Sequence, residues 1–248
     1  MIAIAACVWL ATVAAFASGE REELAFSYPS VRSLIVRSEF LDVEVRAEAG
    51  FPLSMSADLP WDSFFEPRGY RVLHELSGSH LDVWVERDGW FFNNSRGGTL
   101  VFSVPRDISM QIESVSGSLR VEGIDGGDVR AESVSGRMDL REIRGALDAS
   151  SVSGEIAVDR FEGRLAAKTV SGSISGRRVT LTDDSDFSST SGSIDIGIDT
   201  PLEDIRFDLS TVSGRLTVGT LRAARGLRTG SGAVTIRGST ISGSQAYR

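Results

Sequence analysis

Cysteine is almost absent from this chain of 248 residues, and the single one, Cys7, lies in an apolar segment near the amino terminus. The rest of the chain therefore has no thiol for a disulfide or a thiolate metal site, so core packing must hold it together. Lysine is equally rare, since Lys168 is the only lysine among 26 basic residues. No Lys/Arg-rich run occurs, and the formal net charge is −8. This balance excludes the electrostatic footprint of a nucleic-acid-binding protein.

Residue patterns that carry catalysis are also missing. The two histidines, His74 and His80, stand six residues apart, and no H-x-x-x-H or H-E-x-x-H pattern occurs. No nucleophile elbow, P-loop or dinucleotide-binding glycine pattern occurs in a suitable context. The acidic run at 183–186 could hold Ca²⁺ through carboxylates, but an inserted, solvated loop is the favoured interpretation. We predict a protein that is not an enzyme, with no catalytic, cofactor-binding or metal-binding residues.

An apolar segment opens the chain. Residues 2–17 are uncharged and close on an A-x-A pattern that ends at Ala17, which is typical of a secretory signal peptide. The segment is shorter than the roughly 18–20 residues that span a bilayer. No basic residue precedes the segment, so its retention as a short anchor is an alternative to cleavage. A second alternative is a lipobox, which the residues up to Cys7 loosely resemble. We predict a signal peptide at 1–17, cleaved after Ala17, and an exported protein of the periplasm or cell surface.

A Ser-Gly pair recurs through the carboxy-terminal half, 18 to 22 residues apart. Its glycines are Gly117, Gly136, Gly154, Gly172, Gly192, Gly214 and Gly232. Two residues after each glycine stands an apolar residue: Leu119, Met138, Ile156, Ile174, Ile194, Leu216 and Val234. Apolar residues also dominate the positions four after, and five and seven before, the glycine. A repeat of this kind predicts an architecture of stacked units.

The spacing within one repeat predicts its geometry. Alternating apolar positions indicate a strand with one buried face, and a two-residue gap that switches the inward parity requires a corner or bulge. We expect the repeated glycine to supply positive φ at that corner. Successive rungs then stack about 4.8 Å apart, with like residues above like. The prediction is an all-β, β-helix-like solenoid of about seven rungs of 18–22 residues over 106–248.

Two outward columns follow from the same alignment. Glu122, Arg141, Asp159 and Arg177 alternate in sign from rung to rung, which predicts a cross-strand charge ladder. The serines of the Ser-Gly pairs form a hydroxyl column. That column is either a ligand-binding stripe or, as we favour, a set of hydroxyls that satisfy turn backbone groups.

Residues 18–105 lack the repeat. Alternating or apolar stretches at 34–36, 41–45, 81–85 and 100–104 predict strands, so we expect a β-rich region that caps the first rung. Two aromatic clusters lie in loops of this region. Their candidate partner-binding residues are Trp61, Phe64, Phe65, Trp90, Phe91 and Phe92. Such residues could stack on sugars or anchor a protein, whereas the favoured alternative is a hydrophobic plug beneath the cap.

The segment LVFSVP at 100–105, leading through 112–117 into the V-S-G rungs, resembles a bacterial adhesin-like group, domain-of-unknown-function family 4097. The resemblance covers about residues 30–240. It implies an extracytoplasmic or membrane-associated β-solenoid without an established activity, and it supplies no catalytic residues. Members in some bacteria accompany cell-envelope stress systems.

The sequence thus favours a non-catalytic, exported binding or scaffold protein of the cell envelope or surface. Its partner is unknown; a surface glycan and an envelope protein are the candidates. Alternatives are an envelope-stress regulatory component and a carbohydrate-active enzyme built on a β-helix. Self-association through a terminal rung near Ile236 and Ile241 is a further candidate, because an uncapped strand edge can pair with another chain.

Overall fold

The computed structural model describes residues 14–18, 21–28, 30–60, 70–87 and 98–248. The regular secondary structure of these residues consists of strands and one short 3-10 helix, Leu202–Asp204. The strands are β1 (Ala14–Ser18), β2 (Arg21–Tyr28), β3 (Ser33–Ser38), β4 (Asp42–Ala47), β5 (Leu53–Pro60), β6 (Tyr70–Ser77), β7 (His80–Arg87), β8 (Thr99–Val104), β9 (Ser109–Ser114), β10 (Leu119–Glu122), β11 (Val129–Ser133), β12 (Met138–Ser151), β13 (Ile156–Thr169), β14 (Ile174–Leu181), β15 (Ser185–Ser189), β16 (Ile194–Ile198), β17 (Ile205–Ser213), β18 (Leu216–Val218), β19 (Leu221–Ala223), β20 (Gly226–Thr229), β21 (Val234–Ser242) and β22 (Gln245–Tyr247).

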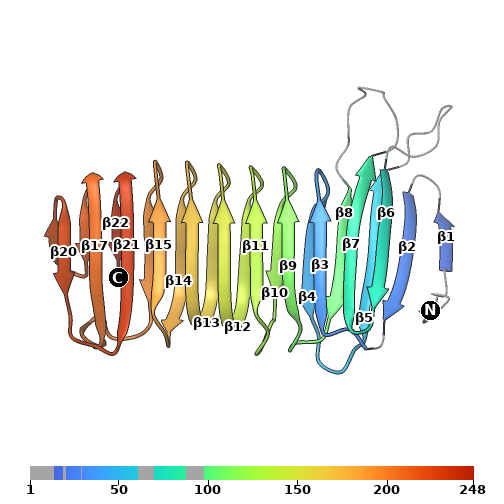
Figure 1. The fold of residues 1–248 in the computed structure, drawn as a ribbon, viewed down its shortest axis with the longest axis horizontal. Helices are drawn as coiled ribbons and strands as arrows, with labels where there is room; N and C mark the ends of the chain where they lie inside the picture. The colour runs from blue at the N-terminus through green and yellow to red at the C-terminus, as the bar shows by residue number, and fades with distance from the viewer. Residues whose placement is uncertain (1–13, 19–20, 29, 61–69, 88–97) are drawn as a thin grey trace, which may run out of the picture.

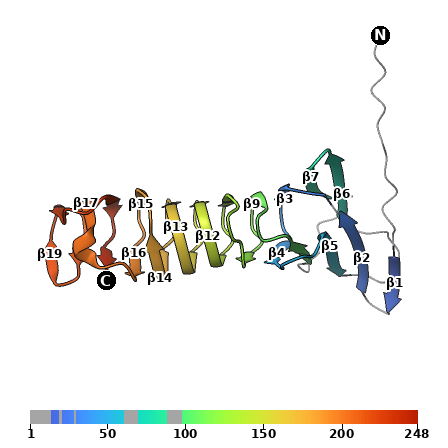
Figure 2. The same cartoon turned by 90° about the horizontal axis from the view of Figure 1, so that it is seen from below.

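The strands lie side by side in an elongated blade made of two layers (Figures 1 and 2). The front layer runs β6-β7-β3-β9-β11-β12-β13-β15-β21-β17-β20. The back layer runs β1-β2-β5-β8-β4-β10-β12-β13-β14-β16-β22-β18-β19. The long strands β12 and β13 belong to both layers, because their first halves pair in the back layer and their second halves in the front layer. All 22 strands therefore form one continuous sheet.

The predicted apolar columns are the core of the blade. Leu119 pairs in register with Met138, Met138 with Ile156, and Ile156 with Ile174. All four side chains are buried. The prediction of an all-β, solenoid-like stack is confirmed, and the physical reason is the one expected: each rung covers the apolar side chains of the next.

The Ser-Gly glycines do not serve the role predicted for them. Gly136 and Gly154 do not have positive φ, and that prediction is wrong. A Cβ at Gly136 would overlap the carbonyl oxygen of Gly117, and a Cβ at Gly154 would overlap that of Gly136. Successive rungs approach so closely at this corner that only a residue without a side chain fits.

Positive φ occurs six residues after these glycines instead. The column consists of Gly123, Glu142, Arg160 and Arg178, with φ of 87°, 53°, 56° and 54°. Only the first of the four is glycine, so the sequence gives little sign of this corner. Three further glycines, nine residues after Gly117, Gly136 and Gly154, also have positive φ: Gly126, Gly145 and Gly163. The chain thus turns between layers through left-handed residues that the Ser-Gly repeat does not mark.

Hydroxyl side chains at two positions of the repeat form hydrogen bonds with backbone groups of the turn. Ser116 and Ser135 of the predicted column donate to carbonyl oxygens of the preceding rung, at 3.1 Å each, as predicted. A second, buried hydroxyl column, three residues before each glycine, was not predicted. In this column Ser151 Oγ accepts the Gly154 N–H at 2.8 Å, and the same bond recurs at 2.7–3.0 Å in three other rungs. The V-S-G signature is therefore one part of a longer S/T-x-x-G turn.

The predicted charge ladder is aligned but paired differently. Glu122, Arg141, Asp159 and Arg177 stand in register on adjacent strands. The shortest ion pairs, however, join Arg141 to Asp139 at 2.7 Å within one strand, and Asp159 to Arg178 at 2.6 Å. The Arg178 hydrogen bond lowers the pKa of the Asp159 carboxyl.

The order of the last rungs differs from the order in the sequence. Ile194 pairs with Gln245, and Gln245 pairs on its other side with Leu216. Strands β21 and β22 therefore insert between β15–β16 and β17–β18 (Figure 1). In the glycine column Gly243 lies between Gly192 and Gly214, because a Cβ at Gly243 would overlap the carbonyl oxygen of Gly192 and a Cβ at Gly214 would overlap that of Gly243. The assignment of Gly232 to this column is wrong.

This insertion also corrects the expected terminal edge. Ile236 is fully buried between β15 and β17, so it is not at an open end. Ile241 is exposed, but it lies within the stack and not at its end. The last parallel strands, β17 and β18, are each covered by a short antiparallel strand, β20 and β19.

The β-rich amino-terminal region is confirmed. Strands β3 and β4 continue the parallel stack, since Leu34 pairs with Met110 and Val43 with Leu119. Antiparallel strands β6 in the front layer and β5, β2 and β1 in the back layer follow at this end. Residues 1–13 of the predicted signal peptide lie outside the described residues. No helix in the described part of the chain is long and apolar enough to cross a membrane.

Candidate binding surface

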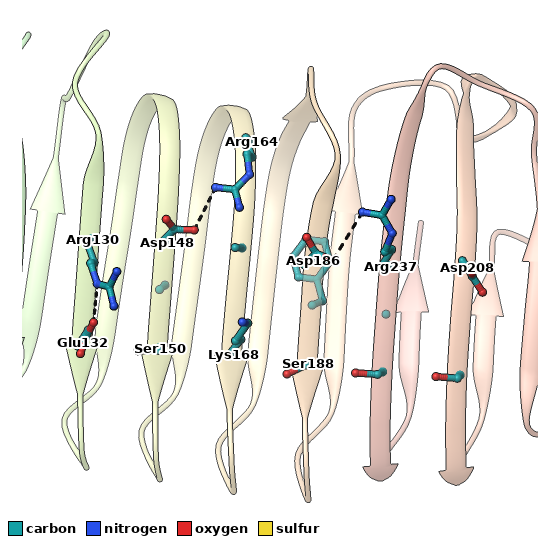
Figure 3. A pocket seen from close by; sticks show the side chains of 16 residues that line it. Arg130, Glu132, Asp148, Ser150, Arg164, Lys168, Asp186, Ser188, Asp208 and Arg237 are labelled. Atoms are coloured by element: carbon teal, nitrogen blue, oxygen red, sulfur yellow. Dashed lines mark hydrogen bonds and ion pairs between the residues drawn. The ribbon is translucent and has the colours of Figure 1, made fainter.

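The outward face of the front layer contains a shallow depression with a volume of about 760 Å³ (Figure 3). It extends over six neighbouring strands, β11, β12, β13, β15, β21 and β17. At about 4.8 Å per strand, these span roughly 24 Å along the blade. Its charged lining residues are Arg130, Glu132, Asp148, Arg164, Lys168, Asp186, Asp208 and Arg237.

Strand periodicity places these side chains outward. In β13 Arg164, Ala166 and Lys168 point outward and alternate with the inward residues Leu165 and Ala167. Arg164 and Lys168 are exposed, whereas Ala166, at the bottom of the depression, is only 8% exposed. One row across the strands consists mostly of small hydroxyl residues: Ser150, Lys168, Ser188, Ser239 and Ser210 are paired in that order. The surface is hollow here because serine and alanine replace the long side chains that cover other outward positions.

Most of the lining charges are already paired. Arg130 contacts Glu132 at 2.6 Å, Arg164 contacts Asp148 at 3.2 Å, and Arg237 contacts Asp186 at 3.9 Å. The hydrogen bond from Arg130 to Glu132 raises the pKa of Arg130 further above its ordinary value. The lining holds four cations and four carboxylates, so its formal charge is zero on a chain whose net charge is −8.

The acidic run at 183–186 has structural roles. Asp184 accepts the Thr235 N–H at 2.9 Å and pairs with Arg237 at 3.1 Å. The Thr235 hydrogen bond lowers the pKa of Asp184. The carboxylate of Asp186 belongs to the depression. Among the described residues, no group of three or more His, Cys, Asp or Glu side chains could hold a metal ion.

The predicted aromatic binding residues cannot be placed. Trp61, Phe64, Phe65, Trp90, Phe91 and Phe92 all lie outside the described residues. Nearby in the sequence, His74 packs against Phe26 and Tyr28, with ring centroids 4.6 and 5.7 Å apart. Burial lowers the pKa of His74 and raises the pKa of Tyr28 to about 12. His74 is thus a packed side chain at the amino-terminal end of the blade.

A second surface feature is a ridge of valines along one corner. Val115, Val134, Val152 and Val170 are each 45–46% exposed, whereas Val212, in the last parallel strand, is 73% exposed. The first four valines stand on successive rungs, whereas Val212 lies beside strand β21. The ridge is accounted for by stacking of β-branched side chains across rungs.

The repeat alignment contained a signal for the depression that sequence reasoning missed. The outward positions four and six before the Ser-Gly glycines hold Ser150, Ala166, Ser188 and Ser210, a cluster of small residues on neighbouring rungs. Lys168 stands in the same columns. Ser239 could not be assigned to them, because its rung was misaligned.

Matching residues stacked in register on parallel strands define the protein as an all-β, solenoid-like repeat protein. The model of the family described as Toastrack DUF4097 matches residues 107–243, more than half of the chain. The chain therefore belongs to the DUF4097 family. No curated protein matches it.

Several solved structures resemble this chain over nearly its whole length. A "putative adhesin" from Bacteroides fragilis is 12% identical, with 93% of this chain and 98% of that chain covered and a TM-score of 0.48. A "putative lipid binding protein" from Parabacteroides distasonis is 16% identical, with 93% and 97% covered and a TM-score of 0.48. A "putative cell adhesion protein" from Clostridium sporogenes is 6% identical, with 92% and 99% covered and a TM-score of 0.43. At these identities the likeness concerns the fold alone.

Proposed function

We propose that the protein is a non-catalytic binding module, exported to the cell envelope or surface, that holds an extended polar polymer along the depression of the front layer. The observation that carries this proposal is the depression itself, which crosses six strands and is lined by hydroxyls and balanced charges. The signal-like segment at 1–17 supports export. A surface glycan is the polymer class that we favour.

The shape and chemistry of the depression suit a polymer better than a compact ligand. Small-molecule sites are usually concave and mostly apolar, whereas this surface is open and polar. Its serines recur on neighbouring strands about 4.8 Å apart, so a repeating ligand can make similar contacts on several rungs. Serine hydroxyls both donate and accept hydrogen bonds, which matches the hydroxyls of a sugar chain.

The state of the carboxylates supports a binding role rather than catalysis. Glu132, Asp148 and Asp186 each face an arginine within 4.0 Å. These three carboxylates are therefore engaged in ion pairs within the protein and are less available to a substrate as acid or base.

The test is binding of the full-length protein to a panel of soluble polysaccharides and to envelope proteins. Ala166→Gln should fill the depression and weaken polysaccharide binding at least tenfold. Ala157→Gln is the matched control, because Ala157 is an outward alanine of the same strand in the back layer; this variant should bind like wild type. Thermal melting of both variants checks that the fold is retained.

Three results would count against the proposal. If wild type binds no polysaccharide but captures one specific envelope protein, a regulatory role replaces it. If a polysaccharide is cleaved, and a carboxylate variant abolishes the turnover, the protein is an enzyme. If Ala166→Gln binds as well as Ala157→Gln, the polymer lies elsewhere.

A further inference from the structure

Lys168 differs from the other cations of the depression. The three lining arginines each contact a carboxylate within 4.0 Å. Among the described residues, no carboxylate lies within that distance of the Lys168 ammonium, although its side chain is exposed beside them. It is also the only lysine in the chain. The depression therefore contains one cation whose charge is not already used within the protein.

The surroundings of Lys168 are those of a polar binding site. Ser150 and Ser188 are its register partners on the two flanking strands (Figure 3). Ala166, two residues earlier in the same strand, also lines the depression. The hydroxyl row continues away from it on one side through Ser239 and Ser210. An ammonium is a compact charge with three donors, and the hydroxyls around it can donate or accept.

The charge balance decides which ligand fits. The lining is formally neutral, so an anion is not repelled there as it is elsewhere on an acidic chain. A densely charged polyphosphate would call for several free cations, preferably arginines that bind bidentately. Here one free ammonium stands in a row of hydroxyls, which suits a ligand with many hydroxyls and sparse carboxylates.

We propose that Lys168 binds a carboxylate of an acidic polysaccharide of the uronic acid type, while the flanking serines contact its sugar hydroxyls. This inference rests on the proposed function, because it names the class of polymer that the depression holds. The ammonium donates to the carboxylate oxygens, and the sugar chain runs along the blade across β12, β13, β15, β21 and β17.

Polygalacturonate and neutral dextran are the probes, measured with full-length protein by calorimetry at low and moderate salt. Wild type should bind polygalacturonate more tightly, and added salt should weaken that binding. Lys168→Gln should weaken it about tenfold, as expected for one charge-assisted hydrogen bond. Lys168→Arg should restore most of it. Arg177→Gln, which removes an exposed positive charge from the back layer, should leave it unchanged.

The outcomes separate this inference from the proposed function. If wild type binds no polysaccharide, both fall. If it binds dextran and polygalacturonate equally well, or if Lys168→Gln binds polygalacturonate like wild type, the carboxylate contact is wrong and the binding role stands. If polyphosphate displaces polygalacturonate at lower concentration, the anion class is wrong.

A chemical readout exploits the single lysine. A carbodiimide couples a bound carboxylate to an amine as an amide, with loss of water. With a galacturonate oligosaccharide, the mass should increase on the peptide that contains Lys168, and excess polygalacturonate should suppress the addition. The Lys168→Arg variant keeps the α-amino group of the chain but contains no lysine. It is therefore the control for addition at Lys168. Addition at the terminal amine alone would overturn the inference.

Discussion

Residues 109–198 and residues 205–247 build the same two layers by different routes. In the first region each rung lies on the rung that precedes it in the chain, so Met138 follows Leu119 and Ile156 follows Met138. In the second region the chain first forms β17 and β18, reverses through β19 and β20, and returns to place β21 and β22 inside the stack.

The difference shows what a repeat specifies. Each rung presents the same inward side chains and the same backbone groups, so any rung can pair with any other in register. The order in which they stack depends on connections and ends. By turning back, the chain leaves β17 and β18 at the edge, where β20 and β19 cover them. Covering an edge strand blocks pairing with another chain.

The largest expected effect comes from a charge placed in the sequential region. Leu140 is fully buried in a column of stacked residues. Leu140→Asp should lower the free energy of unfolding by more than about 4 kcal/mol, because the carboxylate would be unpaired in the core. Leu227→Asp, on the covering strand β20, should cost about 1–2 kcal/mol. Denaturant unfolding measures both, and equal losses would contradict the contrast between core and edge.

The next effect tests the inserted rung. Tyr247 is fully buried although it is the penultimate residue, and its ring lies 5.9 Å from Phe187 and 5.6 Å from Phe207. Tyr247→Ala should cost about 3–5 kcal/mol, as for other buried aromatic residues. Tyr247→Phe loses only the contact of its hydroxyl with Gln245 and should cost about 1 kcal/mol. A wild-type melting temperature for Tyr247→Ala would mean that β22 is not inside the stack.

A smaller effect separates the two kinds of glycine. Gly136→Ala should cost about 3 kcal/mol, because its Cβ would overlap the carbonyl oxygen of Gly117 and the rungs would have to move apart. Gly126 has φ of 94° and open space around its Cβ position, so Gly126→Ala should cost about 1 kcal/mol from backbone strain alone. If thermal unfolding shows Gly126→Ala to be the more destabilising of the two variants, close approach of the rungs is not the reason for glycine at the Ser-Gly corner.

The smallest effect concerns the amino-terminal end. Burial against Phe26 and Tyr28 lowers the pKa of His74 below that of the unfolded chain. The unfolded state therefore takes up the proton first, and stability should fall as the pH drops from about 7.5 to 5.5. His74→Gln should flatten this slope in melting experiments. An unchanged slope in His74→Gln would assign the dependence to other groups.

The candidate site was only partly accessible from the sequence. The alternation within each rung fixed Ser150, Ala166 and Lys168 as outward residues, and their alignment on neighbouring rungs was available. The sequence did not show that these residues form a depression. A row of small residues becomes a depression only when its neighbours carry longer side chains. The pairing of Arg130, Arg164 and Arg237 with carboxylates, which isolates Lys168, depends on side-chain geometry.

The sequence determined the inward columns and the register of the central rungs, since apolar periodicity dictates which side chains leave water. The repeat also showed that the Ser-Gly corners need glycine. Only the tertiary structure decided why those glycines are needed, where the left-handed corners lie and which rung ends the stack. The physical reason is that these features depend on backbone approach between rungs and on competition among equivalent partners. Local patterns of residues do not encode either quantity.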